Sequence, residues 1–266
     1  MNTVIFLNPF SCLKPSPFLI FVFLMSLLMG KAREFIVMLI LALMLPTAMA
    51  ITPPSNALSF SGSYVQTNEV NLGTSHFTLE GWVKPNGTAG AIYNNRISEG
   101  GADGNWFTLF LTNNNKLQIE LAHGGVGGYT APIGNISLTT GVWHHIAVVK
   151  NTTHITFYVD GVLDAQIADP YARNMTGGGI MTIGMKYGGF SYFNGQIDEF
   201  RVWKTALSQV EIQTNMHNSL VGNEPNLVAY YDFDQTSGTI LPDLTVHGHN
   251  GTLVNSPLWH CAGGLP

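Results

Sequence analysis

Charged side chains are scarce in this chain, and basic ones are the scarcer kind. Only 10% of the 266 residues are charged, with 11 Lys plus Arg against 16 Asp plus Glu and a formal net charge of −5. A protein that binds nucleic acid needs a basic patch or stripe that neutralises phosphates. This composition provides none, so we exclude nucleic acid as a partner.

Cysteine is almost absent. The two cysteines are Cys12 and Cys261, and Cys12 lies in an N-terminal segment that we expect to be removed. One remaining thiol allows neither an intramolecular disulfide nor a cysteine-based zinc site. An apolar core must therefore hold the mature domain together, which a chain of this length can provide.

No apolar run has the length of a membrane-spanning helix. Residues 18–29 and 35–45 are apolar, but each run has only about a dozen residues, whereas a spanning helix needs about 20. We therefore expect no membrane span in the mature form. A two-helix membrane hairpin is the weaker alternative.

The N-terminal segment instead has the order of a secretory signal. Lys31 and Arg33 precede the apolar run 35–45, and the small-residue ending Ala48-Met49-Ala50 follows it. We predict that residues 1–50 are a signal peptide or apolar export segment, cleaved after Ala50. The mature protein is then secreted or held at the cell surface. Met29 is an alternative start of the same signal.

The rest of the chain has the pattern of short strands. The segment 142–149 has apolar residues on both of its alternating sides, as expected of a strand buried on at least one face, and the next strand ends at Asp160-Gly161, a dipeptide that favours a tight hairpin turn. Strands are also predicted at 57–60, 64–66, 76–84, 91–97, 106–112, 116–122, 162–168, 180–184, 194–203, 227–233 and 252–254. One short helix begins near Ser208, with Glu211 completing a capping box. The pattern predicts an all-β protein with antiparallel sheets, a sandwich or jelly roll.

Several segments resemble a known family. The strand Trp143-His144-His145, the hairpin Tyr158-Val159-Asp160-Gly161, and the stretches 57–65, 77–85 and 195–203 are similar to signatures of the laminin G-like jelly-roll family. This family lies in the concanavalin A-like lectin/glucanase superfamily, and pentraxins carry a similar Trp-His-His strand. The resemblance implies a jelly-roll domain at 51–260, followed by a short tail, 261–266. It also implies a module that binds rather than catalyses, although one fold hosts many functions.

Two charged residues in predicted strands, Glu80 and Arg201, lie among apolar neighbours in the sequence. A lone buried charge is costly, so we expect these two to pair across the sheet as a structural pair. A glycoside hydrolase of this superfamily would need two carboxyl groups about 5–10 Å apart at a cleft. Asp198 and Glu199 are adjacent and should therefore point to opposite faces of a strand. This favours a protein without catalytic residues.

Metal-binding residues are hard to assign. His144 and His145 are adjacent on a strand, so they cannot hold one ion together. Calcium needs about six to eight oxygen ligands, and several aspartates border loops: Asp103, Asp169, Asp198, Asp234 and Asp243. The resemblance to pentraxins predicts an acidic cluster at 184–189, where this chain has no acid. One structural Ca²⁺ remains an expectation without a ligand set.

Aromatic residues near glycine-rich loops are the candidate ligand-binding residues. They are Trp106, Tyr129, Tyr187, Phe190 and Tyr192, with Phe193 beside them. Sugar rings stack on exposed aromatic faces, and nearby polar groups bind hydroxyls. The competing interpretation is that most of these rings cap the ends of the sandwich.

These observations predict a secreted, non-catalytic recognition module that binds carbohydrate or an extracellular protein. A polysaccharide-acting glycoside hydrolase of the same superfamily is one alternative. An adhesive or structural module of a larger surface protein is the other.

Overall fold

The computed structural model describes residues 56–73, 76–87, 89–96, 105–122, 128–172, 175, 179–189 and 191–260. The predicted signal segment, Asp103, Phe190 and the tail 261–266 lie outside these ranges. Among the described residues, none of the helices has both the length and the apolar character to cross a membrane.

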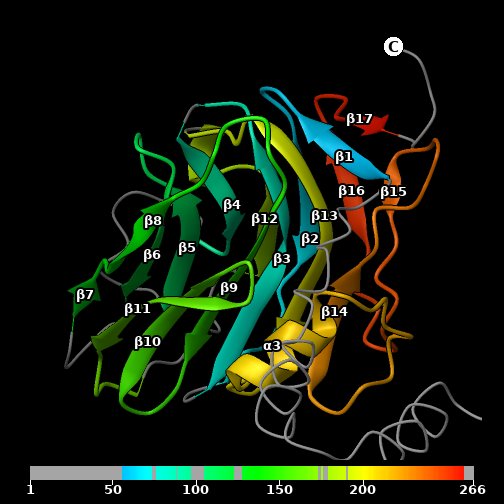
Figure 1. Ribbon diagram of the computed structural model, residues 1–266. Coiled ribbons are helices and arrows are strands. Elements are labelled where there is room, and N and C mark those ends of the chain that lie inside the picture. Colours follow the sequence, from blue (N-terminus) through cyan, green and yellow to red (C-terminus); the bar gives the residue numbers. More distant parts are fainter. Residues whose placement is uncertain are drawn as a thin grey trace, which may run out of the picture. The chain divides into compact units, whose positions relative to one another are not determined.

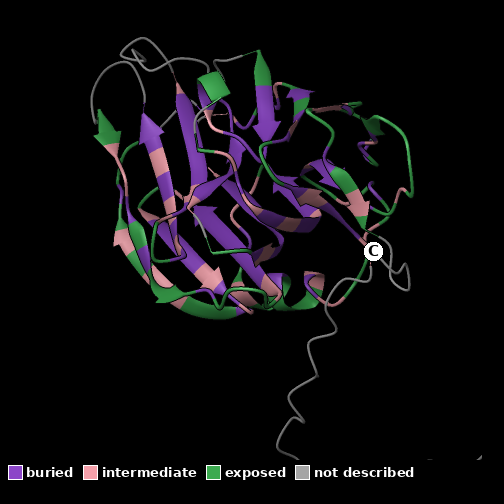
Figure 2. Ribbon diagram, turned by 90° about the horizontal axis from the view of Figure 1, so that it is seen from above, coloured by how far each residue is buried: buried purple, intermediate pink, exposed green. Residues whose placement is uncertain are grey.

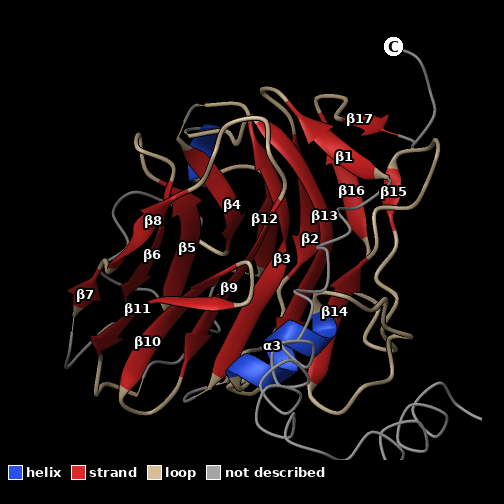
Figure 3. Cartoon of the chain, in the orientation of Figure 1, coloured by secondary structure: helices blue, strands red, loops and turns tan. Residues whose placement is uncertain are grey.

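The chain forms two antiparallel sheets, as the predicted jelly-roll sandwich requires (Figures 1 and 3). In order, the eight-stranded sheet contains β11 (Val162–Ala168), β10 (His154–Val159), β9 (His144–Lys150), β3 (Phe77–Pro85), β13 (Gly195–Trp203), β1 (Ala57–Phe60) and β17 (Leu258–His260), with β14 (Leu227–Tyr231) also paired to β13. The nine-stranded sheet contains β15 (Ile240–Leu241), β16 (Gly251–Val254), β2 (Tyr64–Asn68), β12 (Ile180–Ile183), β4 (Gly90–Asn94), β5 (Trp106–Leu111), β6 (Lys116–Ala122) and β7 (Tyr129–Thr130), with β8 (Ile133–Ser137) also paired to β6.

The core lies between the two sheets because alternate residues of each strand point inward. On β3, Phe77 and Leu79 are buried, and on β5, Phe107 and Leu109 are buried. The rings of Phe77 and Phe107 stack across the interface with centroids 6.0 Å apart. Figure 2 shows buried residues concentrated on the strands, with exposed residues mainly in the loops around them. Truncating such a residue removes about 2–5 kcal/mol of stability.

The turn between β10 and β11 has the conformation predicted from Asp160-Gly161. Asp160 has φ 51° and Gly161 has φ 71°, which is the two-residue left-handed geometry of a type I′ turn. The Asp160 carboxylate accepts a hydrogen bond from the backbone N–H of His145 at 2.9 Å and contacts His144 Nδ1 at 2.9 Å. The hairpin is therefore fixed to the neighbouring strand.

Strand β13 departs from the regular alternation that the sequence argument assumed. Its register against β3 shifts between Asp198 and Arg201, and Glu199 has φ 50°. This is a β-bulge, in which one extra residue on β13 re-aims a side chain. The Glu199 carboxylate contacts Arg201 and Tyr230 on the outer face of the sheet. Strict alternation at Asp198 and Glu199 was therefore a wrong prediction.

Helix α3 (Gln209–Asn215) covers the outer face of the eight-stranded sheet (Figure 1). Ser208 and Glu211 form the predicted capping box at its start. The helix and the segments beside it pack on the outward residues of β9, β13 and β14. This second apolar cluster contains Ala147, Val149, Trp203, Leu207, Ile212, Leu227 and Tyr230.

Candidate functional site

The outer face of the nine-stranded sheet carries the candidate site. On β5 the inward residues Phe107 and Leu109 belong to the core, so Trp106 points outward. On β6 the same alternation buries Ile119 and turns Glu120 outward. We call the group of Arg96, Trp106, Glu120, Tyr129, Lys186 and Tyr187 the aromatic–cation cluster.

An arginine lies between two aromatic rings at the centre of this cluster. The Arg96 guanidinium carbon lies 4.1 Å from the ring centroid of Trp106 and 4.5 Å from that of Tyr187. A guanidinium over an aromatic face is attracted by the ring quadrupole, worth about 0.5–2 kcal/mol. Trp106 and Tyr187 are consequently only 6% and 9% exposed.

Glu120 is the polar centre of the cluster. Its carboxylate accepts a hydrogen bond from Lys186 Nζ at 2.7 Å and from the Tyr129 hydroxyl at 3.0 Å, and it lies 3.7 Å from Arg96. Burial, and then the Glu120 charge, raise the pKa of Tyr129 to about 12. The side chains of Arg96, Glu120 and Lys186 stay 13–18% exposed. The cluster is thus pre-ordered and partly exposed, with Tyr129 as its exposed member.

The predicted aromatic residues divide into exposed and buried rings. Tyr129 is 58% exposed, and its ring lies 6.0 Å from that of Trp106. Tyr192 is half-buried and lies 6.4 Å from Tyr64 on the same sheet. Phe193 is fully buried. The expectation of exposed stacking faces is met by Tyr129 and not by Trp106, Tyr187 or Phe193.

A close backbone approach positions the loop that carries Tyr192. Ala91 of β4 and Tyr192 form an isolated parallel bridge. A Cβ atom on Gly90 would lie 2.3 Å from the Tyr192 carbonyl oxygen. Only glycine therefore lets this loop lie against the strand.

Three members of the cluster were missed in the sequence analysis: Arg96, Glu120 and Lys186. Their contacts join distant parts of the chain, since Glu120 and Lys186 are 66 residues apart. One signal was available. The run Lys116 to Glu120 alternates polar and apolar residues, which predicts a solvent-facing polar stripe on β6.

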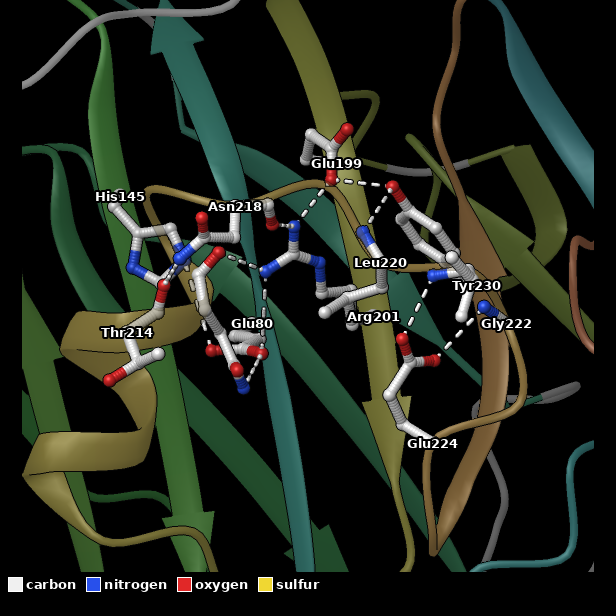
Figure 4. A network of polar contacts seen from close by, with 12 residues as sticks. Glu80, His145, Glu199, Arg201, Thr214, Asn218, Leu220, Gly222, Glu224 and Tyr230 are labelled. Carbon is white, nitrogen blue, oxygen red and sulfur yellow. Dashed lines mark hydrogen bonds and ion pairs between the residues drawn. The ribbon is translucent and has the colours of Figure 1, made fainter. Parts of the chain in front are cut away.

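The other outer face holds a buried charge network beneath α3 (Figure 4). Glu80 and Arg201 lie opposite each other on β3 and β13, with Glu80 Oε1 3.8 Å from an Arg201 nitrogen. Glu80 also accepts hydrogen bonds from Trp203 Nε1 at 2.9 Å and from Asn215 Nδ2 at 3.1 Å. Burial raises the pKa of Glu80, while the Arg201 charge acts in the opposite direction.

Arg201 is held from several sides. It donates to the carbonyl oxygens of Asn215 at 2.7 Å and Asn218 at 2.8 Å, and to the Glu199 carboxylate. Burial alone would lower its pKa, but the charges of Glu80 and Glu199 raise it overall. The guanidinium is therefore a structural group: its two Nη atoms donate to protein acceptors, while the buried Nε has no hydrogen-bond partner among the described residues.

His145 completes the network as a neutral ring. Its Nε2 lies 3.9 Å from Glu80 Oε2, and its ring lies edge-on to Trp82 with centroids 5.4 Å apart. Burial, followed by the Arg201 charge, lowers the pKa of His145 to about 3. The ring is therefore uncharged at neutral pH. His144 points to Asp160 instead, so the two histidines serve different contacts.

No calcium ligand set emerges from the described residues. Among them, no group of three or more His, Cys, Asp or Glu side chains is placed to hold a metal ion. Asp169 lies 3.6 Å from Lys150, Asp234 accepts from Asn56, and Asp243 accepts from backbone N–H groups. Asp198 is buried with Oδ1 lacking a hydrogen-bond partner, and burial raises its pKa to about 9.

Comparisons with known proteins agree with this architecture. The sequence profile of a family described as the concanavalin A-like lectin/glucanases superfamily matches residues 60–213. A proposed carbohydrate-binding protein from Bacteroides ovatus superimposes with a TM-score of 0.63 at 22% identity, over 80% of this chain and 61% of that chain. A heptameric SAP-like pentraxin from Limulus polyphemus gives a TM-score of 0.53 at 14% identity, over 80% of this chain and 98% of that one. No curated protein matches this chain. At these identities the structural likeness shows the fold.

Proposed function

Since this chain belongs to the concanavalin A-like lectin/glucanases superfamily, we propose that it is a secreted, non-catalytic module that binds carbohydrate through the aromatic–cation cluster. The observation that carries the proposal is the open outer face of the nine-stranded sheet, where Tyr129 and Glu120 stand side by side. The likeness to the B. ovatus protein supports the same class of ligand. The predicted export segment at residues 1–50 supports a location outside the cell.

The cluster has the groups that sugar recognition needs. Tyr129 offers an exposed ring on which a pyranose can stack, and Glu120 offers an acceptor for ring hydroxyls. Arg96 and Lys186 provide charged donors beside it. Because each polar group is already held by a neighbour, binding costs little side-chain ordering. Tyr192, next to Tyr64, extends the aromatic surface on the same sheet.

The carboxylates of the described residues favour binding over hydrolysis. Glu120 is the single carboxylate of the aromatic–cation cluster, and it is engaged by Arg96, Tyr129 and Lys186. Hydrolysis of a glycosidic bond uses a facing pair of carboxyl groups. Glu80, Asp198 and Glu199 lie on the other sheet, where Arg201 engages Glu80 and Glu199, and Asp198 is buried. This supports a recognition module rather than the hydrolase alternative.

A protein partner is the second candidate. Exposed apolar side chains gather on β8 and on β11, where Asp164 accepts hydrogen bonds from the backbone of β8. They are Ile133, Ile136, Val162 and Leu163. Such side chains suit protein contact better than sugar contact, and an adhesive module of a larger surface protein would use them.

A glycan array probed with the mature chain tests the proposal, with Tyr129→Ala as the key variant. We expect binding to at least one glycan class, and a loss of about tenfold in affinity on removal of the stacking ring, about 1.4 kcal/mol. Tyr171→Ala is the matched control, since Tyr171 is 42% exposed and lies outside the cluster. A blank array, or equal affinities for the two variants, would refute the proposal.

A further inference from the structure

A concavity lies at the rim of the eight-stranded sheet, and none of its lining residues belongs to the aromatic–cation cluster. It has a volume of about 410 Å³ and is formed where β1, β3, β13 and β17 end or begin. Figure 1 shows the labels of β1 and β17 next to each other at this end. The volume falls within the range of small-ligand sites, about 300–1,000 Å³. We call it the rim pocket.

The lining of the rim pocket is dominated by uncharged polar side chains. Serine hydroxyls come from the β1 strand and the turn after it, and from the segment before β17: Ser59, Ser61, Ser63 and Ser256. Three amides, Asn86, Asn194 and Gln196, face the same space. Hydroxyl and amide groups both donate and accept hydrogen bonds. They therefore match the hydroxyls of a sugar.

Neighbouring contacts hold these polar groups in place. Gln196 Nε2 donates to Ser59 Oγ at 3.1 Å, and Asn86 Nδ2 donates to Asn194 Oδ1 at 3.4 Å. Each side-chain amide has two donors and two acceptor lone pairs. These bonds fix orientation and leave further hydrogen-bonding capacity for a ligand.

The backbone around the rim pocket is tightly constrained. Gly195 has φ 153°, and a Cβ atom there would lie 2.3 Å from the Lys84 carbonyl oxygen. Asn255 and Ser256 both have left-handed φ values, 58° and 54°. Asn255 Nδ2 donates to the Gly62 carbonyl at 3.3 Å, which ties the two rim turns together. Two successive strained non-glycine residues persist only where the surroundings hold them.

Lys84 is the single ionisable side chain of the lining. Its ammonium group makes no ion pair or side-chain hydrogen bond with any described residue, and the side chain is half-buried. By contrast, Lys150 pairs with Asp169, and Lys186 pairs with Glu120. An unpaired cation in a partly enclosed polar space attracts an anion.

We propose that the rim pocket is a binding site for a sugar acid, a ring that bears several hydroxyls and one carboxylate. The carboxylate pairs with Lys84, and the hydroxyls bind the serine and amide groups. A simple inorganic anion would use Lys84 and leave the polar lining without partners. A neutral sugar would use the lining and leave Lys84 uncompensated. The site is independent of the cluster proposed above.

Titration of the mature chain with glucuronate, glucose and sulfate tests this assignment by saturation-transfer NMR. We expect glucuronate to bind at least tenfold more tightly than either of the other two. Lys84→Met keeps the apolar stem and removes the charge, so it should abolish this preference. Gln196→Glu places a repulsive carboxylate in the lining and should have the same effect. Lys204→Met, an exposed lysine elsewhere, is the matched control and should change nothing.

Three results would overturn the proposal. The first is equal affinity for glucose and glucuronate. The second is full displacement of glucuronate by sulfate at the same concentration. The third is an undiminished preference for glucuronate in Lys84→Met and Gln196→Glu, with melting temperatures unchanged from the parent. Tyr129→Ala separates the two sites. If it removes glucuronate binding, the sugar acid occupies the aromatic–cation cluster and the rim assignment is wrong. If the glycan array is blank while Lys84→Met still loses the preference for glucuronate, the rim pocket is a binding site and the proposal for the aromatic–cation cluster is wrong.

Discussion

The outer faces of the two sheets use the same chemistry in different surroundings. Each pairs an arginine with a glutamate beside aromatic rings: Arg201 and Glu80 on one sheet, and Arg96 and Glu120 on the other. The first pair is 2% and 0% exposed, and the second pair is 14% and 13% exposed. An arginine–glutamate pair is thus buried on one face and partly exposed on the other.

The difference follows from what covers each face. Helix α3 and the segments around it pack on the eight-stranded sheet and supply the carbonyls of Asn215 and Asn218 to Arg201 (Figure 4). On the nine-stranded sheet, rings of Trp106 and Tyr187 flank Arg96, but Tyr129 remains exposed. A buried ion pair is sensitive to loss of one partner, whereas an exposed one is weak. The covered face should therefore carry stability, and the open face should carry binding.

Removing the arginine from the covered face should produce the largest effect. Arg201→Met leaves Glu80 buried without its cation, so we expect a loss of about 3–5 kcal/mol in the free energy of unfolding. Urea denaturation of the parent and the variant measures this difference in unfolding free energy. The double variant Glu80→Leu, Arg201→Met removes both charges and should lose less than Arg201→Met alone. A loss below about 1 kcal/mol for the single variant would show that the network is not structural.

The pH dependence of stability should reveal the neutral histidine of the covered face. The pKa of His145 is about 3 in the folded protein and 6.5 in the unfolded chain. Below pH 6.5 the unfolded chain therefore binds a proton that the folded protein does not. The contribution of His145 to stability should therefore fall by about 1.4 kcal/mol per pH unit as pH falls, and so by about 1.5–2 kcal/mol between pH 6.5 and 5.

His145→Phe isolates this contribution because it keeps a ring beside Trp82 and removes the titration. The fit of the larger ring affects absolute stability, so the readout is the slope of unfolding free energy against pH. Glu80 and Asp198 act in the opposite sense, since their raised pKa values make the folded protein bind more protons than the unfolded chain near pH 5. This carboxyl contribution is present in both the parent and His145→Phe, so it cancels when their slopes are compared. Parallel slopes for the parent and His145→Phe would contradict the prediction.

Local signals predicted much of the fold. The hairpin turn at Asp160-Gly161 and the capping box of Ser208 and Glu211 each involve residues that are within a few positions of one another in the sequence. Strand β11, Val162–Ala168, has the predicted bounds. Local signals do not predict pairing between strands that are distant in sequence. Strand β17 is short and pairs with β1, at the other end of the domain. β8 was missed because most of its residues are exposed, which removes the apolar alternation.

The candidate site was predictable only in part, for a related reason. Aromatic residues near loops indicated Trp106, Tyr129 and Tyr187, but no local pattern shows that Arg96 would lie between two of these rings. The bulge at Glu199 was also invisible, because a left-handed residue in an apolar strand has no side-chain signature. Sequence periodicity specifies which face a residue occupies, and tertiary packing decides whether that face is covered.

Removing the arginine from the open face should produce the smallest effect on stability. Arg96→Met loses a partly exposed ion pair and two ring contacts, so we expect a decrease of about 1 kcal/mol or less in unfolding free energy. Glycan affinity should fall more clearly, because Glu120 and Trp106 lose the group that orders them. Lys116→Met is the control, a cation on the same strand as Glu120, and should leave both quantities unchanged. A loss of about 3 kcal/mol for Arg96→Met, comparable to that of a buried pair, would show that the open face is as structural as the covered one and would remove the reason for placing the ligand there.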